Sequence, residues 1–177
     1  PPKRYDLITQ INARGSFLMA RACMPHMRAG GFGRVVCMSP PIVTNVGAFN
    51  ARTAYNISKM GMTMVALGVC AENRKENIIG ASLWPATVIE SQASINFDLG
   101  DTSLWRKACI LADCVVGIVM EGDDYRGHML IDDEYLRVRQ GFGDEELVQY
   151  RYNPDVEPPR LLAEEADSSS VKRGSVT

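Results

Sequence analysis

Two short apolar runs that both end at a proline restrict the fold of this chain more than any other feature. They occupy residues 33–39 and 78–84, and a long helical pattern that contains Tyr55 and Leu67 separates them. Apolar runs of this length, bounded by glycine and proline, are typical of strands that are buried on both faces of a parallel sheet. The chain is therefore predicted to be an α/β protein with a parallel sheet.

The residues that follow these two strands are expected to border a ligand site. Ser39 ends the first run, and the loop Pro85-Ala86-Thr87 follows the second. In open α/β sheets, ligands bind in the crevice outside the carboxyl ends of the strands. Ser39 and the Pro85–Thr87 loop therefore lie at the edge where a substrate would bind. A turn serine before Pro40 and a simple turn after residue 84 are the structural alternatives.

Tyr55 and Lys59 are four residues apart on the predicted helix, so their side chains share one face. A free tyrosine has a pKa near ~10 and exchanges protons poorly at neutral pH unless a nearby cation favours the phenolate. Lys59 is placed to be that cation, and we expect it to lower the pKa of Tyr55. A solvated helix face is the alternative explanation of the same spacing.

A second helix is predicted over residues 8–27, and it contains one polar residue among apolar neighbours. Asn12 lies between Ile8, Ile11, Gly15 and Leu18. Asparagine competes with the helix for backbone hydrogen bonds, so its presence inside a helix needs a reason.

With Asn12, Ser39, Tyr55 and Lys59 identified, the chain resembles the short-chain dehydrogenase/reductase family, whose catalytic tetrad is Asn, Ser, Tyr and Lys. The hydroxysteroid dehydrogenase-like branch is the most similar. Its serine stands in a Ser-Pro-Pro motif 16 residues before the tyrosine, as in Ser39-Pro40-Pro41, whereas the more usual family spacing is shorter. The branch also shares Leu83-Trp84-Pro85. The resemblance covers about residues 5–139.

The resemblance implies hydride transfer between a nicotinamide and a carbonyl or alcohol, with NAD or NADP as cofactor. Tyr55 would be the general acid or base. Lys59 would lower its pKa and bind the ribose, Ser39 would polarise the substrate oxygen, and Asn12 would hold a relay water. The implied cofactor contacts are Tyr55, Lys59, Pro85, Thr87, Val88 and Ile89. The substrate is a small molecule, and steroid, fatty acyl (lipid-like) and small aldehyde classes all remain open.

The glycine-rich turn that binds the cofactor pyrophosphate in this family does not occur in the 177 residues. Residues 30–33 are Gly-Gly-Phe-Gly, but they precede a strand and are typical of a helix stop. We therefore expect a three-layer Rossmann-like parallel sheet without its N-terminal βαβ units. Residues 1–142 would form the catalytic half, and residues 143–177 a Pro-rich, acidic and largely irregular tail. The alternative function is an inactive fragment or pseudoenzyme that serves as a dimerising interaction module.

The helix that carries Tyr55 has more apolar surface than one sheet can cover. Its apolar and small residues include Met60, Gly61, Met62, Met64, Leu67 and Gly68. A second apolar face predicts a partner, and the family resemblance implies a homodimer or homotetramer built on this helix and the Asn12 helix. Coverage by the chain's own elements is the alternative.

Composition is that of a single domain, with 46% hydrophobic and 23% charged residues and a net charge of −2. The chain is not basic enough for nucleic acid, has no apolar run of the ~20 residues that span a bilayer, and begins without a signal-peptide pattern. Five scattered cysteines and two histidines predict neither disulfides nor a metal site. We expect an intracellular, cytoplasmic protein, or a mitochondrial or peroxisomal one if an N-terminal signal has been lost.

Four further elements are expected after the second strand. Residues 88–97 form a short helix or mobile flap, and Thr102 or Ser103 caps the next element. Residues 110–120 form a buried helix, and residues 127–132 form a last strand. Residues 161–167 are at best an acidic single helix, and the chain from Ser168 onward is expected to be disordered.

Overall fold

The centre of the computed structural model, which describes residues 1–43, 49 and 52–161, is a parallel sheet of three strands. Their order is β1-β2-β3, with β1 at Gly33–Met38, β2 at Ile78–Trp84 and β3 at Met129–Ile131. Gly33 pairs with Ile78 and Met38 with Leu83, so β1 and β2 are in register over the whole length of β1. The strands predicted from the apolar runs are confirmed.

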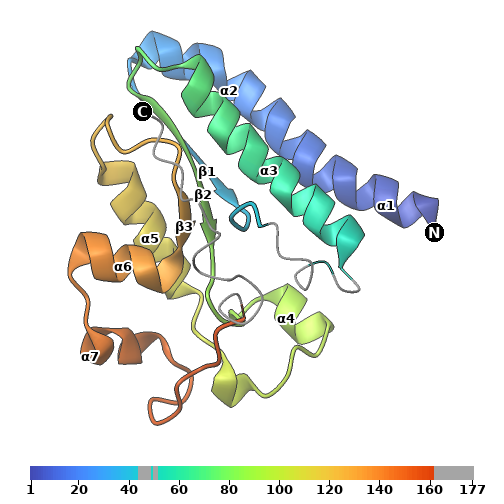
Figure 1. Cartoon of the computed structure of the whole chain (residues 1–177), viewed down its shortest axis with the longest axis vertical. Coiled ribbons are helices and arrows are strands. Elements are labelled where there is room, and N and C mark those ends of the chain that lie inside the picture. The colour runs from blue at the N-terminus through green and yellow to red at the C-terminus, as the bar shows by residue number, and fades with distance from the viewer. Residues whose placement is uncertain (44–48, 50–51, 162–177) are drawn as a thin grey trace.

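Helices cover both faces of this sheet, which makes three layers (Figure 1). One layer contains α1, the π-helical segment η1, α2 and α3; the opposite layer contains α5 and α6. Their bounds are Pro2–Thr9 (α1), Gln10–Arg14 (η1), Gly15–Gly30 (α2), Thr53–Glu72 (α3), Cys109–Met120 (α5) and Asp132–Gln140 (α6). The predicted α/β fold with a Rossmann-like parallel sheet is confirmed.

The middle strand β2 supplies side chains to both layers because successive residues of a strand point to opposite faces. Ala81 and Leu83 belong to a core with Ile110, Cys114 and Ile118 of α5. Ile78 belongs to a second core with Ala20 of α2 and Val69 of α3. All three layers are thus joined through one buried strand, whose apolar run is continuous for that reason.

Gly80 lets α3 lie directly against β2. A Cβ atom on Gly80 would stand 2.0 Å from the Ala66 carbonyl oxygen of α3, far inside van der Waals contact. Any larger residue would separate the helix from the sheet. Tyr55 and Lys59 are on the same helix, so this close contact also determines how near they lie to the sheet.

The predicted helix stop at residues 30–33 is confirmed. Gly31 follows α2 in the left-handed conformation, with φ 67°, and the Phe32 N–H donates to the Met27 carbonyl. A residue without a Cβ adopts this conformation at no steric cost, which ends the helix and turns the chain into β1.

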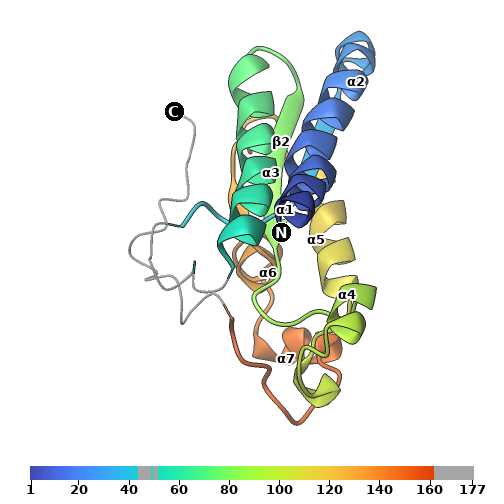
Figure 2. The ribbon, with the colours of Figure 1, turned by 90° about the vertical axis from the view of Figure 1, so that its right-hand side faces the viewer.

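Beyond the carboxyl end of β2 lie short elements, α4 at Gln92–Asn96 and the 3₁₀ helix η3 at Thr102–Leu104 (Figures 1 and 2). The Ser91 side chain caps α4, so residues 88–97 contain the short helix rather than a flap. The predicted cap of the next element is wrong: Asp101 accepts the Ser103 N–H, in place of Thr102 or Ser103. An aspartate one residue earlier supplies the better acceptor.

The prediction of a buried helix at residues 110–120 is correct for one stripe of α5 only. Ile110, Cys114 and Ile118 are buried, whereas Val116 and Met120 are 64% and 80% exposed. The buried residues recur every four positions, so a single face contacts the core. Apolar content alone did not separate a helix with one covered face from a fully enclosed one.

Residues 144–161 pack on the rest of the chain. They contain α7 at Asp144–Leu147 and the 3₁₀ helix η4 at Val148–Tyr150, and the side chains of Leu147 and Tyr150 are each 2% exposed within the α5 and α6 core. The division at residues 142 and 143 stays a prediction. The predictions for residues 162–177 lie outside the described residues.

The helices of residues 1–43, 49 and 52–161 include none that combines the length and apolar content needed to cross a bilayer. All five cysteines are free thiols, and Cys37, Cys70 and Cys114 are buried.

Candidate active site

Tyr55 and Lys59 lie in the first two turns of α3, next to the carboxyl ends of β1 and β2. The Lys59 ammonium donates a hydrogen bond to the Met38 carbonyl oxygen, 3.1 Å away, at the last residue of β1. It stands 6.0 Å from the centroid of the Tyr55 ring and 5.5 Å from that of Trp84, the last residue of β2. Lys59 is therefore fixed to the sheet edge and lies near two aromatic faces, which attract a cation.

The electrostatics of the pair differ from the expectation. Burial raises the pKa of Tyr55, and the Arg52 charge opposes this in part. Burial lowers the pKa of Lys59, with Cys37 opposing. The predicted lowering of the Tyr55 pKa is therefore wrong for this structure, because loss of water around the phenol outweighs the charge of Arg52. Tyr55 is a protonated phenol at neutral pH, which is the form of a proton donor.

Asn12 is bound to the same helix through a serine. Its Nδ2 donates to the Ser58 Oγ at 3.0 Å, and the Ser58 Oγ donates to the Tyr55 carbonyl oxygen at 2.7 Å. Asn12 lies in the π-helical segment Gln10–Arg14 between α1 and α2. The helix predicted over residues 8–27 is confirmed, with this one irregular turn. Single π turns inside helices often mark functional positions, and here the turn carries the residue that the sequence singled out.

A glycine on α3 permits this contact. A Cβ atom on Gly61 would stand 2.7 Å from the Cβ atom of Ala13, the neighbour of Asn12. The absence of a side chain lets α3 approach the π-helical turn closely enough for the bond between Asn12 and Ser58.

Ser39 is at the carboxyl end of β1, as the sequence indicated, and is fully buried. The Thr63 hydroxyl of α3 lies 2.8 Å from the Ser39 Oγ and 2.7 Å from the Pro40 carbonyl oxygen. Thr63 is one turn beyond Lys59. The Ser39 hydroxyl is thus directed at the helix, and its role in polarising a substrate oxygen stays a prediction.

The loop with the predicted cofactor contacts follows β2 and is held by backbone bonds. The Arg106 N–H donates to the Val88 carbonyl at 2.9 Å, and the Glu90 N–H donates to the Arg106 carbonyl at 2.9 Å. Thr87 and Ile89 are 1% and 8% exposed, whereas Pro85 and Val88 are half-buried. The loop lies at the sheet edge beside Trp84, and its contacts with a nicotinamide stay predictions.

The structure adds residues that sequence reasoning did not assign. Ser58 links Asn12 to α3, Thr63 holds Ser39, and the Trp84 ring faces Lys59. Trp84 could have been assigned, since it ends a strand at the ligand edge. No sequence pattern indicated Ser58 and Thr63, because hydroxyl residues on a helix are common and their partners are 46 and 24 residues away.

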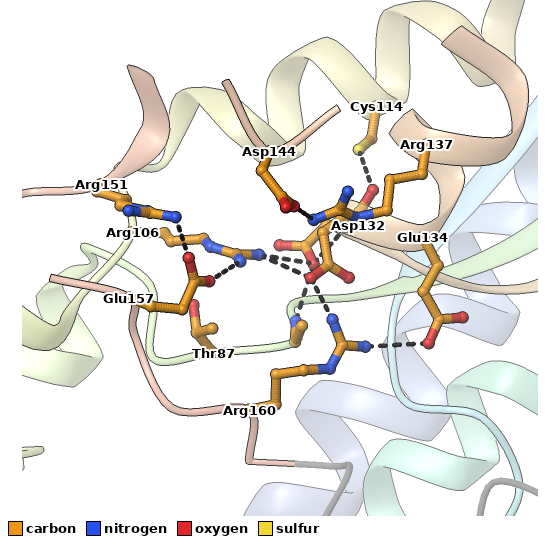
Figure 3. Close-up of polar contacts among 12 residues, drawn as sticks. Thr87, Arg106, Cys114, Asp132, Glu134, Arg137, Asp144, Arg151, Glu157 and Arg160 are labelled. Carbon is orange, nitrogen blue, oxygen red and sulfur yellow. Dashed lines mark hydrogen bonds and ion pairs between the residues drawn. The ribbon is translucent and has the colours of Figure 1, made fainter. Parts of the chain in front are cut away.

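A buried group of charges behind the loop was also missed. Arg106, Asp132 and Asp133 are each at most 2% exposed, and they interact with Glu157 and Arg160 of the C-terminal segment (Figure 3). The one signal was the pair Asp132-Asp133 directly after the last strand, at the same edge as the site.

Comparison with known proteins gives one family and several relatives. The family model described as enoyl-(acyl carrier protein) reductase matches residues 1–94. Hydroxysteroid dehydrogenase-like protein 2 of Rattus norvegicus is 32% identical over 176 residues, which are 99% of this chain and 33% of the relative. The Homo sapiens protein of that name is 31% identical over 176 residues, 97% of this chain and 41% of the relative. The chain therefore spans about a third to two fifths of these relatives' length.

Solved structures match over most of the chain. A dehydrogenase from Xanthomonas campestris has a TM-score of 0.81 at 35% identity and covers 90% of this chain and 58% of its own. A short chain dehydrogenase from Mycobacterium thermoresistibile has a TM-score of 0.79 at 31% identity, covering 90% and 56%. A gluconate 5-dehydrogenase from Burkholderia cenocepacia, solved with NADP and tartrate, has a TM-score of 0.59 at 19% identity over 74% and 54%, and shares the fold.

Proposed function

The chain belongs to the short-chain dehydrogenase/reductase family, and from this premise we propose that it carries the catalytic residues of an NAD(P)-dependent oxidoreductase. The reaction is hydride transfer between a nicotinamide and a carbonyl or alcohol carbon, with Tyr55 as general acid or base. The observation that carries the proposal is the joint anchoring of Asn12, Tyr55 and Lys59 at the carboxyl edge of the sheet. Asn12 is bonded through Ser58 to the turn of α3 that carries Tyr55 and Lys59, and Lys59 is bonded to the end of β1, near the edge where ligands of α/β proteins bind.

The donor chemistry of the site fits a nicotinamide nucleotide. The Lys59 ammonium has three N–H donors, and among the described residues it has one hydrogen-bond acceptor, the Met38 carbonyl. Its other two N–H groups can serve the two ribose hydroxyls. Bound NAD(P)H would supply the hydride, and the chain's residues would position it and move the proton.

Tyr55 keeps its proton at neutral pH in this structure, so we propose that it acts as the acid in the reduction direction. A phenol that keeps its proton at neutral pH can donate it to the oxygen of a carbonyl as negative charge develops there. Lys59, fixed beside the ring, would stabilise the phenolate that remains, and Asn12 would hold a water that returns the proton. Ser39 would orient the substrate oxygen. Pro85, Thr87, Val88 and Ile89 would border the nicotinamide.

The cofactor is NAD or NADP in this proposal; the gluconate 5-dehydrogenase that shares the fold holds NADP. The substrate class is a small carbonyl or alcohol, and a lipid-like chain is one of the options. No contact with nucleic acid is proposed, since the net charge of the chain is −2.

We further propose that a second copy of the chain covers the outer groove between α2 and α3, giving a homodimer or a homotetramer. The groove has a volume of about 670 Å³, and Phe17 and Met64 on its walls are 52% and 64% exposed. Arg21 stands on one wall and Glu72 on the other, and a two-fold arrangement that sets α2 against α3 of the second copy would bring these opposite charges together. Sedimentation velocity of the wild type and Met64→Glu tests this, and the variant is expected to be monomeric.

Cofactor binding tests the proposed function. Titration of the purified protein with NADH and NADPH, followed by nicotinamide fluorescence, is expected to saturate for one of them and to weaken at least ~10-fold in Lys59→Ala. Lys75→Ala removes an exposed lysine from the turn that follows α3 and is the matched control. Equal binding by all three proteins would contradict the proposal. Absent binding in the wild type would favour the alternative function, a dimerising module without activity.

A further inference from the structure

The loop that follows β2 is hydrogen-bonded at three places to residues that the proposed mechanism does not use: Asp132, Leu161 and Arg106. The Ala86 N–H donates to the Asp132 Oδ1 at 2.9 Å, and the Ala86 carbonyl accepts the Leu161 N–H at 2.8 Å. Two and four residues further on, the Val88 carbonyl accepts the Arg106 N–H and the Glu90 N–H donates to the Arg106 carbonyl. Both polar groups of the Ala86 backbone are therefore fixed, and so are the groups on either side of Ile89.

Asp132 is the side chain that binds the Ala86 amide of this loop. It is the first residue of α6, is fully buried, and accepts a second bond from the Asp133 N–H at 2.7 Å on the same oxygen. Its other oxygen, Oδ2, is buried without a hydrogen-bond partner among the described residues. Removing a carboxylate from water costs several kcal/mol unless its lone pairs are satisfied. An apolar residue would fill the position at lower cost, but it could not hold the Ala86 amide.

Arg106 joins this aspartate to the C-terminal segment. Its Nη1 lies 3.1 Å from the Asp133 Oδ2 and 3.9 Å from the Asp132 Oδ1, and its Nη2 lies 3.1 Å from the Glu157 Oε1 (Figure 3). Arg160 pairs with Asp133 and Glu134, directly before the Leu161 amide that binds Ala86. The buried charges thus fix Arg106 and the segment 157–161 in place, and their backbones hold the loop.

We propose that Asp132 is a positioning residue for the Pro85–Ile89 loop, acting through the Ala86 amide. The segment 157–161 holds the same loop through the bond from the Leu161 N–H to the Ala86 carbonyl. This inference rests on the proposed function, in which the same loop borders the nicotinamide. A loop fixed before the cofactor arrives loses no conformational freedom on binding. It also fixes the place of the nicotinamide relative to Tyr55, where a displacement of about 1 Å can cost ~10²-fold in rate.

Aspartate substitutions provide the matched test. Asp132→Ala removes the acceptor of the Ala86 amide, whereas Asp132→Asn keeps an oxygen at that place and removes only the charge. Asp144→Asn removes a carboxylate from an exposed pair with Arg137, outside the contacts that hold the loop, and is the control. In the full-length protein, Asp132→Ala is expected to raise the cofactor KM roughly 10-fold or more. Asp132→Asn should keep the cofactor KM close to that of the wild type, and Asp144→Asn should not change it.

Amide hydrogen exchange gives a readout that does not depend on activity. In Asp132→Ala, the Ala86 amide should lose protection while the β2 amides keep theirs. If Asp132→Ala does not fold, Leu161→Pro removes the second tie at an exposed residue, because proline has no N–H; Leu161→Ala keeps the N–H and is its control. The proline variant should raise the cofactor KM and the alanine variant should not.

Two results would overturn the inference. One is an unchanged cofactor KM in Asp132→Ala or Leu161→Pro while Lys59→Ala abolishes cofactor binding. The other is an Asp132→Asn variant that behaves as Asp132→Ala, which would mean that the charge matters and the loop contact does not. If Lys59→Ala binds cofactor normally, the proposed function fails and this inference fails with it, so the two failures are distinguishable.

Discussion

The two sides of the sheet hold the candidate site by different physical means. On the α3 side, uncharged hydrogen bonds and close packing at glycines place Asn12, Ser58 and Tyr55. On the α6 side, buried charges of both signs hold the loop after β2, with Arg106 at their centre. Neutral bonds tolerate small adjustments, whereas a buried charge that loses its partner is strongly unfavourable. The α6 side should therefore be the more fragile of the two.

Removal of Arg106 should have the largest effect on stability. Arg106→Leu leaves the buried Asp132 without its cation and Asp133 with Arg160 alone, and the free energy of unfolding should fall by ~3–5 kcal/mol. Chemical denaturation measures this. The matched control is Arg137→Leu, which breaks an exposed pair with Asp144 and should cost ~1 kcal/mol or less. Equal losses in the two variants would remove the distinction between buried and exposed charges.

The pH dependence of stability should report on Asp132. Burial raises the pKa of Asp132 to about 6, despite bonds from Ala86 and Asp133 and the charge of Arg106. The folded state thus binds this proton more tightly than the unfolded chain, whose ordinary value is 3.8. The contribution is fully present below pH ~4 and is lost as pH rises through ~6.

Asp132→Asn cannot titrate, so it is the reference for this effect. The stability of the wild type relative to Asp132→Asn should fall between pH 4 and pH 7, by on the order of 3 kcal/mol. Denaturation curves of both proteins across this range measure the difference. A difference that stays constant, or that grows with pH, would contradict a raised pKa.

On the α3 side, the packing contact at Gly80 should be the most sensitive point. Gly80→Ala forces a Cβ atom against the Ala66 carbonyl and should cost ~1–3 kcal/mol of unfolding free energy. Gly68→Ala on α3 has open space in the described part of the chain and should be neutral or stabilising by up to ~1 kcal/mol. Thermal unfolding compares the two variants. A destabilised Gly68→Ala would mean that a steric clash is not what makes alanine unfavourable at these glycines.

Gly61→Ala should act on turnover more than on stability. The new Cβ atom would push the π-helical turn and α3 apart and lengthen the bond between Asn12 and Ser58. We expect kcat to fall ~10-fold, with the cofactor KM nearly unchanged, because Lys59 keeps its contact with Met38. Steady-state kinetics beside Gly68→Ala decide this. A change confined to KM would mean that Asn12 contributes to binding and not to the proton relay.

The sequence predicted what depends on local pattern. The three strands, the helix stop at Gly31 and the shared face of Tyr55 and Lys59 all follow from apolar runs and fixed spacings. The π-helical turn at Asn12 did not follow, because it depends on how closely α3 approaches at Gly61. The predicted direction of the Tyr55 pKa shift was wrong because burial raises this pKa, and burial is set by tertiary packing.

Contacts between distant residues account for the rest of what was missed. Arg106 meets Asp133 and Glu157 across 27 and 51 residues, and Thr63 meets Ser39 across 24. No periodicity relates such positions, and each residue by itself is consistent with a solvated surface. The acidic pair Asp132-Asp133 after the last strand is apparent in the sequence, but Arg106 cannot be identified as its partner from the sequence alone.

The most direct test of the account is single-turnover reduction by Tyr55→Phe in the full-length protein, with the carbonyl substrate found by screening and the preferred nicotinamide. Phenylalanine keeps the ring beside Lys59 and removes the proton. We expect Tyr55→Phe to bind cofactor within about 2-fold of the wild type and to carry out the chemical step ~10²-fold or more slowly. An unchanged rate with intact cofactor binding would contradict the assignment of Tyr55 as the proton donor.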